Sequence, residues 1–337
     1  MGRSEHDQRI LMGPLCRSLR NNCLFTWLCV LAFPAGQGLA VPHPARGDST
    51  QTCIAFLSDT QAPLFFETLY LKSNRNLDAT RALLHDIVTV HPARLFLLGD
   101  LVSAGFYEHT WGTIDTYIDS LRGAGVMVDA VLGNHELLLF PGEGEKEFSS
   151  RFPNASRTGY ARTIDSVGVV LLNSNFDHLS QEEVSAERRW YERTMDTLDI
   201  DPTIRVVIVC CHHAPYSNST IVGSNAEVQK QFVPPYLSSR KARLFISGHA
   251  HAFEHFQIAK KDFLVIGGGG GLLHPLREGT DREWMDLAPV PRPQYHYILV
   301  RRVGQVLHVT IRALQDDFTT VMDLPCALIE DGPPSAK

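Results

Sequence analysis

Side chains that can bind metal ions follow five short apolar runs of the chain, at the point where each run ends. The residues concerned are Asp59 with Gln61, Asp100, Asn134 with His135, His212 with His213, and His249 with His251. A lone aspartate after a strand is more often a turn residue or a helix cap. Oxygen and imidazole ligands together, however, suit zinc, iron or manganese. The set is large enough for two ions, with an aspartate as the bridge.

The apolar runs have the length and composition of buried strands. Residues 52–57, 95–98 and 126–132 are the first three, and helical spacing at 74–91 and 107–123 separates them. This alternation predicts a parallel sheet with crossover helices. Ligands of such sheets bind beyond the carboxyl ends of the strands. The five polar clusters are therefore expected to converge at one edge of one sheet.

The second half of the chain is predicted to be richer in strands. Residues 137–158 are rich in glycine and charge and indicate a long loop. A helix is expected over 181–198, because Ser180 and Glu183 have the spacing of a capping box. Residues 226–239 are expected to be partly helical. The remaining predicted strands are 159–164, 167–173, 205–211, 242–247, 254–258, 263–267, 295–302 and 305–313.

Composition is that of an ordinary folded protein. The chain has 337 residues, of which 44% are hydrophobic and 20% charged, and its formal net charge is −6. A protein that binds nucleic acid through its phosphates would usually carry a basic surplus. No nucleic acid partner is therefore expected, and nothing in the sequence indicates an oligomeric state.

The first forty residues have the order of a signal peptide. A basic stretch at 9–20 precedes an apolar run at 23–33, and small residues follow at 35–40. We therefore predict a signal peptide over 1–40, a linker over 41–51, and a secreted or periplasmic protein. The alternative is a membrane anchor made by an uncleaved signal, but the run falls short of the ~20 residues that span a bilayer. No later segment is apolar enough to span, so no stable membrane span is expected after cleavage.

Cysteine usage does not indicate a disulfide-rich scaffold. Four cysteines lie beyond the predicted signal peptide, and Cys210 and Cys211 end an apolar run, which indicates buried thiols. Cys53 and Cys326 could pair in an oxidising compartment, and the sequence leaves this open. The folded domain is expected to cover 52–325, with a frayed tail over 326–337.

The order of the polar clusters resembles the calcineurin-like metallophosphoesterase family. The resemblance is carried by five blocks: Asp59-Thr60-Gln61, Gly99-Asp100, Gly133-Asn134-His135-Glu136, His213-Ala214-Pro215 and Gly248-His249-Ala250-His251. The stretches around His213 and after Gly248 look like the purple acid phosphatase branch, as does the glycine run at 267–271. The family implies a four-layer α/β/β/α sandwich, with mixed β-sheets flanked by helices.

The resemblance also implies a role for each matching residue. His135 would not bind metal but would lie near the substrate phosphate, as the catalytic residue that protonates the leaving oxygen or holds the phosphate. His213 is preferred to His212 because of its His-x-Pro spacing, and because neighbours on a strand point to opposite faces. The implied metal ligands are Asp59 and His251 for the first ion, Asn134, His213 and His249 for the second, and Asp100 as the bridge.

Two departures from the family pattern bear on the metals. Gln61 stands where the family usually has histidine, and a neutral amide oxygen is a weaker ligand, so the first site could favour a harder ion. Ser103 stands where purple acid phosphatases have a tyrosine, so the iron-containing assignment loses its main support. The cofactor expectation is two divalent ions, drawn from Mn, Zn, Fe and Mg.

The implied activity is hydrolysis of phosphate monoesters or diesters by a bridging hydroxide at a two-metal site. Alternatives are a nucleotide or lipid-linked pyrophosphate hydrolase on the same site, and a non-catalytic metal-binding module. The expected partner is a small phosphorylated substrate. Residues 137–158, 214–235 and 272–293 are the segments expected to shape its pocket, with Tyr216 and Asn218, just beyond His213, as the leading substrate contacts.

Overall fold

Within the part of the chain that the structure describes, twelve strands form two separate six-stranded sheets. The structure, a computed structural model, describes residues 52–64, 67–70, 75–304 and 306–330. The signal peptide and linker predicted over 1–51 lie outside these residues. The first sheet has the order β12(Val321–Glu330)-β11(Val306–Leu314)-β10(His296–Val303)-β1(Cys53–Leu57)-β2(Arg94–Leu97)-β3(Met127–Ala130). The second has the order β4(Tyr160–Ile164)-β5(Val167–Leu171)-β6(Val206–Cys210)-β7(Ala242–Ser247)-β9(Lys261–Ile266)-β8(Phe253–Ile258).

The predicted crossover pattern holds for the first three strands. β1 pairs with β2 in parallel and β2 with β3 in parallel, while β1 pairs with β10 antiparallel on its other side. In the second sheet, β5, β6, β7 and β9 run parallel and the two edge strands antiparallel. Both sheets are therefore mixed, as the family resemblance implied. The expectation that all the polar clusters follow strands of one sheet was wrong, because β6 and β7 belong to the second sheet.

Side-chain alternation along the strands builds three apolar layers. Ile54 and Phe56 of β1 point into a core that also holds residues of the second sheet, such as Ile208. Ala55 and Leu57 point to the opposite face, which packs against helices. A third cluster covers the outer face of the second sheet. These layers give the α/β/β/α sandwich.

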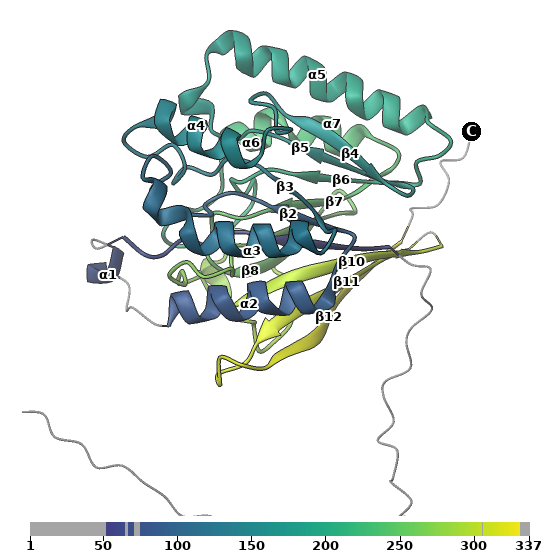
Figure 1. The fold of residues 1–337 in the computed structure, drawn as a ribbon. Helices are drawn as coiled ribbons and strands as arrows, with labels where there is room; N and C mark the ends of the chain where they lie inside the picture. Colours follow the sequence, from purple (N-terminus) through teal and green to yellow (C-terminus); the bar gives the residue numbers. More distant parts are fainter. Residues whose placement is uncertain (1–51, 65–66, 71–74, 305, 331–337) are drawn as a thin grey trace, which may run out of the picture. The chain divides into compact units, whose positions relative to one another are not determined.

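Helices cover the outer face of each sheet (Figure 1). α2 (Asn76–Val90), α3 (Gly112–Gly123) and α4 (Pro141–Arg151) contribute to the apolar layer of the first sheet. α5 (Gln181–Ile200), α6 (Ala226–Gln231) and α7 (Val233–Ser238) contribute to that of the second. The short elements are α1 (Glu67–Tyr70), η1 (Glu108–Trp111), η2 (Phe176–His178) and η3 (Gly279–Asp281).

Two local predictions have opposite outcomes. The capping box of α5 is confirmed: the Ser180 hydroxyl accepts from the Glu183 amide at 3.2 Å, and the Glu183 carboxylate accepts from the Ser180 amide at 2.8 Å. The long loop predicted over 137–158 was wrong, because it contains α4. That helix begins with Pro141 in its first turn, and it buries Phe148 against the first sheet's core.

The carboxyl-terminal region is more ordered than the sequence suggested. β12 runs from Val321 to Glu330, so the sheet continues five residues past the predicted domain end at 325. Cys53 and Cys326 are both free. β10 and β11 lie between their strands, which puts the two cysteines about 14 Å apart, whereas a disulfide needs Cα atoms within about 7 Å. The pairing that the sequence left open is therefore excluded in this fold.

A search of the described residues for membrane-spanning segments finds no helix that is long and apolar enough to cross a bilayer.

Candidate metal centre

The carboxyl ends of strands from both sheets meet at one place. Asp59, Asp100 and Asn134 follow β1, β2 and β3, while the two histidine pairs follow β6 and β7. The backbone amide of His249 donates to both carboxylate oxygens of Asp59, at 3.1 and 3.0 Å, and so ties one sheet to the other. Two groups of ligand atoms lie within 4.8 Å of one another: Asp59, Asp100 and His212, and His212, His213 and His249.

Three of the predicted ligands have a left-handed backbone. The φ angles of Asp59, Asp100 and His249 are 61°, 51° and 67°. Side chains with a Cβ rarely adopt this region, which costs roughly 1 kcal/mol or more per residue. Glycines beside them allow the tight turns: Gly99 has a φ of 88°, and a Cβ there would lie 2.6 Å from the Gly133 amide nitrogen. Strain of this kind concentrates at functional sites.

Glu136 joins the loops that carry Asp100 and Asn134. Its carboxylate is fully buried and accepts backbone N–H groups of four residues: Gly133 at 2.7 Å, Asp100 at 2.9 Å, Leu101 at 2.7 Å and Val102 at 3.3 Å. Burial, followed by repulsion from Asp100, raises the pKa of Glu136 to about 7. The sequence alone assigns this residue no role, and its place directly after Asn134-His135 is the one signal that points to it.

His212 lies at the centre of both ligand groups. Its Nε2 is 3.1 Å from Asn134 Oδ1 and 3.3 Å from Asp100 Oδ2, and its Nδ1 donates to the Leu98 carbonyl at 2.9 Å. Burial lowers the pKa of His212, but the negative charge of Asp100 outweighs this and raises it to about 9. The alternation argument that separated His212 from His213 does not apply here, because both lie past the end of β6. The choice of His213 as the ligand stays a prediction.

His213 and His249 form the more open side of the cluster. Their ring centroids are 4.4 Å apart, and both side chains are half-buried. Burial, followed by the charge of His212, lowers the pKa of His213 to about 3, and burial followed by His213 and His212 lowers that of His249. Both imidazoles are therefore neutral near pH 7 and have a lone pair for a cation. Ser174 fixes His213, because its hydroxyl lies 2.9 Å from both the amide nitrogen and Nδ1 of that residue.

His251 forms the buried side of the cluster with Asp59. Its Nε2 lies 3.5 Å from Asp59 Oδ1, and its Nδ1 donates to the Leu272 carbonyl at 2.7 Å. Fixing Nδ1 in this way leaves Nε2 to face a cation. The His274 ring stacks on His251, with centroids 4.3 Å apart.

Gln61 is buried beside His251, with its side-chain amide 3.1 Å from Nε2 of that residue. All polar atoms of the amide are satisfied when its nitrogen donates to the carbonyl oxygens of Asp100 and Asp59, at 2.9 and 3.3 Å. Its oxygen then faces His251. Gln61 therefore lies at the predicted first site, and direct metal binding by its oxygen stays a prediction.

His135 lies at the edge of the cluster. Its Nε2 is 3.9 Å from Asp100 Oδ2, and its Nδ1 donates to the backbone carbonyl of Ser103 at 3.0 Å. Ser103 thus orients the His135 ring through its backbone carbonyl. It has no phenolate to offer to a metal ion, unlike the tyrosine that purple acid phosphatases have at this position. The position of His135 suits a residue that touches a group bound to the cluster without itself being a ligand.

The two predicted substrate contacts have packing roles in the structure. Asn218 is 1% exposed, and its Oδ1 accepts from the amides of Glu283 and Trp284, both at 3.0 Å. Tyr216 is buried with its ring against Phe263 and Trp284, at centroid distances of 4.9 and 4.6 Å. These contacts hold the 283–284 segment to the second sheet. They favour a structural role for both residues over substrate binding.

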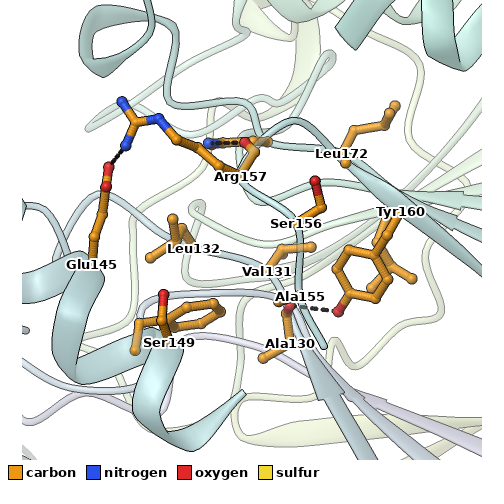
Figure 2. A pocket seen from close by; sticks show the side chains of 14 residues that line it. Ala130, Val131, Leu132, Glu145, Ser149, Ala155, Ser156, Arg157, Tyr160 and Leu172 are labelled. Atoms are coloured by element: carbon orange, nitrogen blue, oxygen red, sulfur yellow. Dashed lines mark hydrogen bonds and ion pairs between the residues drawn. The ribbon is translucent and has the colours of Figure 1, made fainter. Parts of the chain in front are cut away.

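A small cavity lies beside the strand ends but does not include the cluster (Figure 2). It measures about 50 Å³ and is lined by residues such as Leu132, Phe148 and Leu172. Arg157 lines it and forms ion pairs with Glu145 and Glu183. This space is large enough for only a few water molecules, so it does not accommodate a substrate.

The donor set fits a pair of cations. The carboxylate oxygens of Asp59 and Asp100 and the neutral imidazoles of His213 and His249 belong to the two ligand groups, and the amide oxygen of Asn134 lies beside His212, which both groups share. Burial alone would raise the pKa of Asp100, but the charges of His212 and His135 hold it well below its usual range, so it is ionised. An ionised carboxylate has two oxygens that can each contact a cation, so the chemistry of Asp100 suits a bridging ligand.

Comparisons with known proteins agree with this architecture. A family model for calcineurin-like phosphoesterases matches residues 53–253, more than half of the chain. A protein of Arabidopsis thaliana described as "Probable purple acid phosphatase 20" is 28% identical over 217 residues, which are 58% of this chain and 48% of that protein. The chain thus spans about half the length of this curated relative.

Solved structures share the fold. Purple acid phosphatase PPD1 of yellow lupin (Lupinus luteus) has a TM-score of 0.62 at 14% identity, over 81% of this chain and 53% of that chain. A dimetal phosphatase of Danio rerio has a TM-score of 0.52 at 12% identity, over 82% of this chain and 99% of that chain. GAP50, an anchor in the inner membrane complex of Plasmodium, has a TM-score of 0.54 at 13% identity, over 82% and 89%. Because the family model matches more than half of this chain, the chain belongs to the calcineurin-like phosphoesterase family.

Proposed function

We propose that this protein is a metal-dependent hydrolase of phosphate esters. The observation that carries the proposal is that two groups of ligand atoms share His212: Asp59, Asp100 and His212 form one, and His212, His213 and His249 form the other, with the atoms of each group within 4.8 Å of one another. Family membership and the resemblance to a purple acid phosphatase support the same reaction class. The substrate is a small phosphorylated compound, a monoester or a diester.

The proposed ligand set keeps the division that the resemblance implied. One cation would be held by Asp59 and His251, with Gln61 beside them, and Asp100 would be shared with the other. The second cation would be held by Asn134, His213 and His249. Two divalent ions, drawn from Mn, Zn, Fe and Mg, would supply positive charge to the phosphate oxygens and lower the pKa of a water molecule for attack.

The chain's own residues orient the reacting groups. His213 and His249 are neutral and half-buried, so the substrate phosphate approaches on their side. His135 lies near Asp100, and its Nε2 can donate a proton or a hydrogen bond to the leaving oxygen. Ser103 and Ser174 hold the rings of His135 and His213 in place. His212 donates toward Asp100 and Asn134 and so orients both.

The test separates bridging from proton donation. Asp100→Asn should abolish turnover of an aryl phosphate monoester and of an aryl diester, and should reduce bound metal at both positions. His135→Ala should cut turnover by a factor of 10² or more, on the order expected for general acid catalysis, and leave the metal content nearly unchanged. Asp262→Asn is the matched control, because Asp262 is a buried carboxylate that pairs with a histidine, His255, outside the cluster. Parent-like turnover in Asp100→Asn would refute the bridge.

Two other activities remain as alternatives for the same ligand set. A nucleotide or lipid-linked pyrophosphate hydrolase would turn over diphosphate compounds and neither aryl ester. A non-catalytic metal-binding module would bind ions and turn over no phosphate compound. The second alternative is less favoured, because His135 is present beside Asp100 and, among the ligand positions, only Gln61 departs from the usual family pattern.

We also propose that the chain is exported by a signal peptide over 1–40 and functions in a secreted or periplasmic setting. The order of basic, apolar and small residues supports this. The amino-terminal sequence of the protein recovered from its native source tests it, since a mature protein that begins at Met1 would refute cleavage.

A further inference from the structure

Large apolar side chains are exposed on the two loops that adjoin His135. Leu139 is 74% exposed, Phe140 57% and Tyr107 56%. The Phe140 ring packs edge-on against Phe106, with centroids 4.9 Å apart, so the two loops form one apolar surface. Single exposed apolar residues are common, but several gathered on neighbouring loops indicate a binding surface.

Leu139 is held in an unfavourable backbone conformation. Its φ is 61°, in the left-handed region that glycine and asparagine adopt most readily. The backbone conformation of this leucine destabilises the fold, and its side chain does not compensate, because most of it is exposed to water. Among the described residues, eight other non-glycine residues have a positive φ: the predicted ligands Asp59, Asp100 and His249, and five residues outside the cluster, His91, Asp165, Ala259, Lys260 and Phe318. Strain of this kind indicates a functional constraint.

The apolar surface is continuous with the metal cluster through backbone contacts. The His135 carbonyl accepts from the Gly105 amide at 3.0 Å and from the Leu138 amide at 3.4 Å. Both loops are therefore anchored at the residue whose Nε2 lies 3.9 Å from the Asp100 carboxylate. A phosphate ester held at the cluster with its leaving oxygen near His135 would therefore have its alcohol part beside the two loops that carry this surface.

We propose that Tyr107, Leu139 and Phe140 bind the apolar alcohol part of the substrate, an alkyl chain or an aryl ring. This proposal rests on the proposed phosphoesterase function and narrows its substrate class to phosphate esters of apolar alcohols. Contact between apolar surfaces removes both from water and contributes in proportion to the area covered. Esters of small polar alcohols gain nothing from this contact.

The experiment compares homologous substrates. The ratio of kcat/KM for n-octyl phosphate to that for methyl phosphate measures the alkyl contribution. The ratio for benzyl phosphate, whose leaving alcohol has an acidity close to that of methanol, measures the aryl one. The parent should prefer the apolar esters. Leu139→Asn removes the apolar side chain but keeps a residue that tolerates the left-handed backbone, and it should reduce the octyl ratio roughly tenfold, as expected for losing contact with about two methylenes. Phe140→Ser should act in the same direction.

Met322→Asn is the matched control. Met322 is an apolar residue, 50% exposed, on edge strand β12 of the first sheet, and its replacement should leave both ratios unchanged. Calorimetric binding of n-octylphosphonate and methylphosphonate supplies a readout that does not depend on turnover. Octyl-selective binding that depends on Leu139, without hydrolysis of any ester, would support the apolar surface and refute the hydrolytic function.

Other outcomes overturn the proposal itself. If the parent's kcat/KM for n-octyl phosphate is close to that for methyl phosphate, the proposal is refuted. It is also refuted if the ratio of the two values stays the same in both Leu139→Asn and Phe140→Ser. A dimer in solution that dissociates in Leu139→Asn would assign the surface to a second copy of the chain and would equally overturn substrate binding.

Discussion

Replacing Glu136 with glutamine is a direct test of how the cluster is held together. Each carboxylate oxygen of Glu136 accepts from two backbone amides: Oε2 from Gly133 and Asp100, and Oε1 from Leu101 and Val102. Glutamine keeps one oxygen and replaces the other with an NH₂ group, which cannot accept. Two of the four amides, which lie in or next to the loops of the predicted ligands, would then lose their partner, and fewer hydrogen bonds would hold the two loops together.

The effects on stability and on metal binding should differ in size. Hydrogen bonds to a charged acceptor contribute about 1.5–3 kcal/mol each, so losing two costs roughly 3–6 kcal/mol. The shift of the Glu136 pKa from 4.5 to about 7 means that folding disfavours its ionised form by on the order of 3 kcal/mol, which the neutral glutamine recovers. Stability should therefore fall by no more than about 3 kcal/mol. Metal affinity should fall roughly tenfold to a hundredfold, as for other partners of metal ligands.

The assay is bound metal measured against buffered free metal, with urea unfolding of the same preparations. Glu187→Gln is the matched control. Glu187 lies on α5 and is equally buried, but its carboxylate accepts from a single backbone amide, that of Asn173. That variant should bind metal as the parent does. If folded Glu136→Gln also retained parent affinity at both positions, Glu136 would not position the loops, and the reasoning would be refuted.

Two further predictions concern stability. Gly144→Ala should lower the free energy of unfolding by more than about 3 kcal/mol, because a Cβ there would overlap the carbonyl oxygen of Glu136. A Cβ at Gly142, on the same helix, would meet no atom within 4 Å, so Gly142→Ala should be neutral or stabilising by up to about 1 kcal/mol. Equal urea midpoints for the two variants would contradict this prediction. Burial raises the pKa of Glu187 from 4.5 to about 8, so the folded protein holds this proton more tightly than the unfolded chain, and stability is lost as pH rises through this interval, by on the order of 3 kcal/mol at pH 7. Glu187→Gln should remove that part of the decline between pH 5 and 8, and parallel unfolding curves for parent and variant at the two pH values would show that Glu187 does not titrate in this way.

The strands and their polar ends could be predicted because each signal is local. A run such as 52–57 is apolar on both faces, since one face packs against the other sheet and one against helices. What a local pattern could not show is which sheet a strand joins. β6 has the same apolar character as β2, and only its pairing with β5 and β7 places it in the second sheet. The number of sheets followed from the family resemblance rather than from periodicity.

The misses have separate physical causes. α4 contains Pro141, Gly142 and Gly144, which indicate a loop, but tertiary packing of Phe148 outweighs those weak propensities. His212 and His213 could not be separated, because the alternation rule holds within a strand and these residues follow one. The role of Glu136 depends on four amides from two loops, and the sequence shows no sign of that convergence.

The left-handed backbone at positions 59, 100 and 249 has a consequence for attempts to make this protein more heat-resistant. Glycine would relieve the conformational cost at each of these positions, and asparagine would reduce it. Selection for thermal tolerance alone would therefore favour the removal of two carboxylates and an imidazole. Variants recovered from such a screen should unfold at higher temperature but bind metal ions poorly, unless the screen also selects for metal binding.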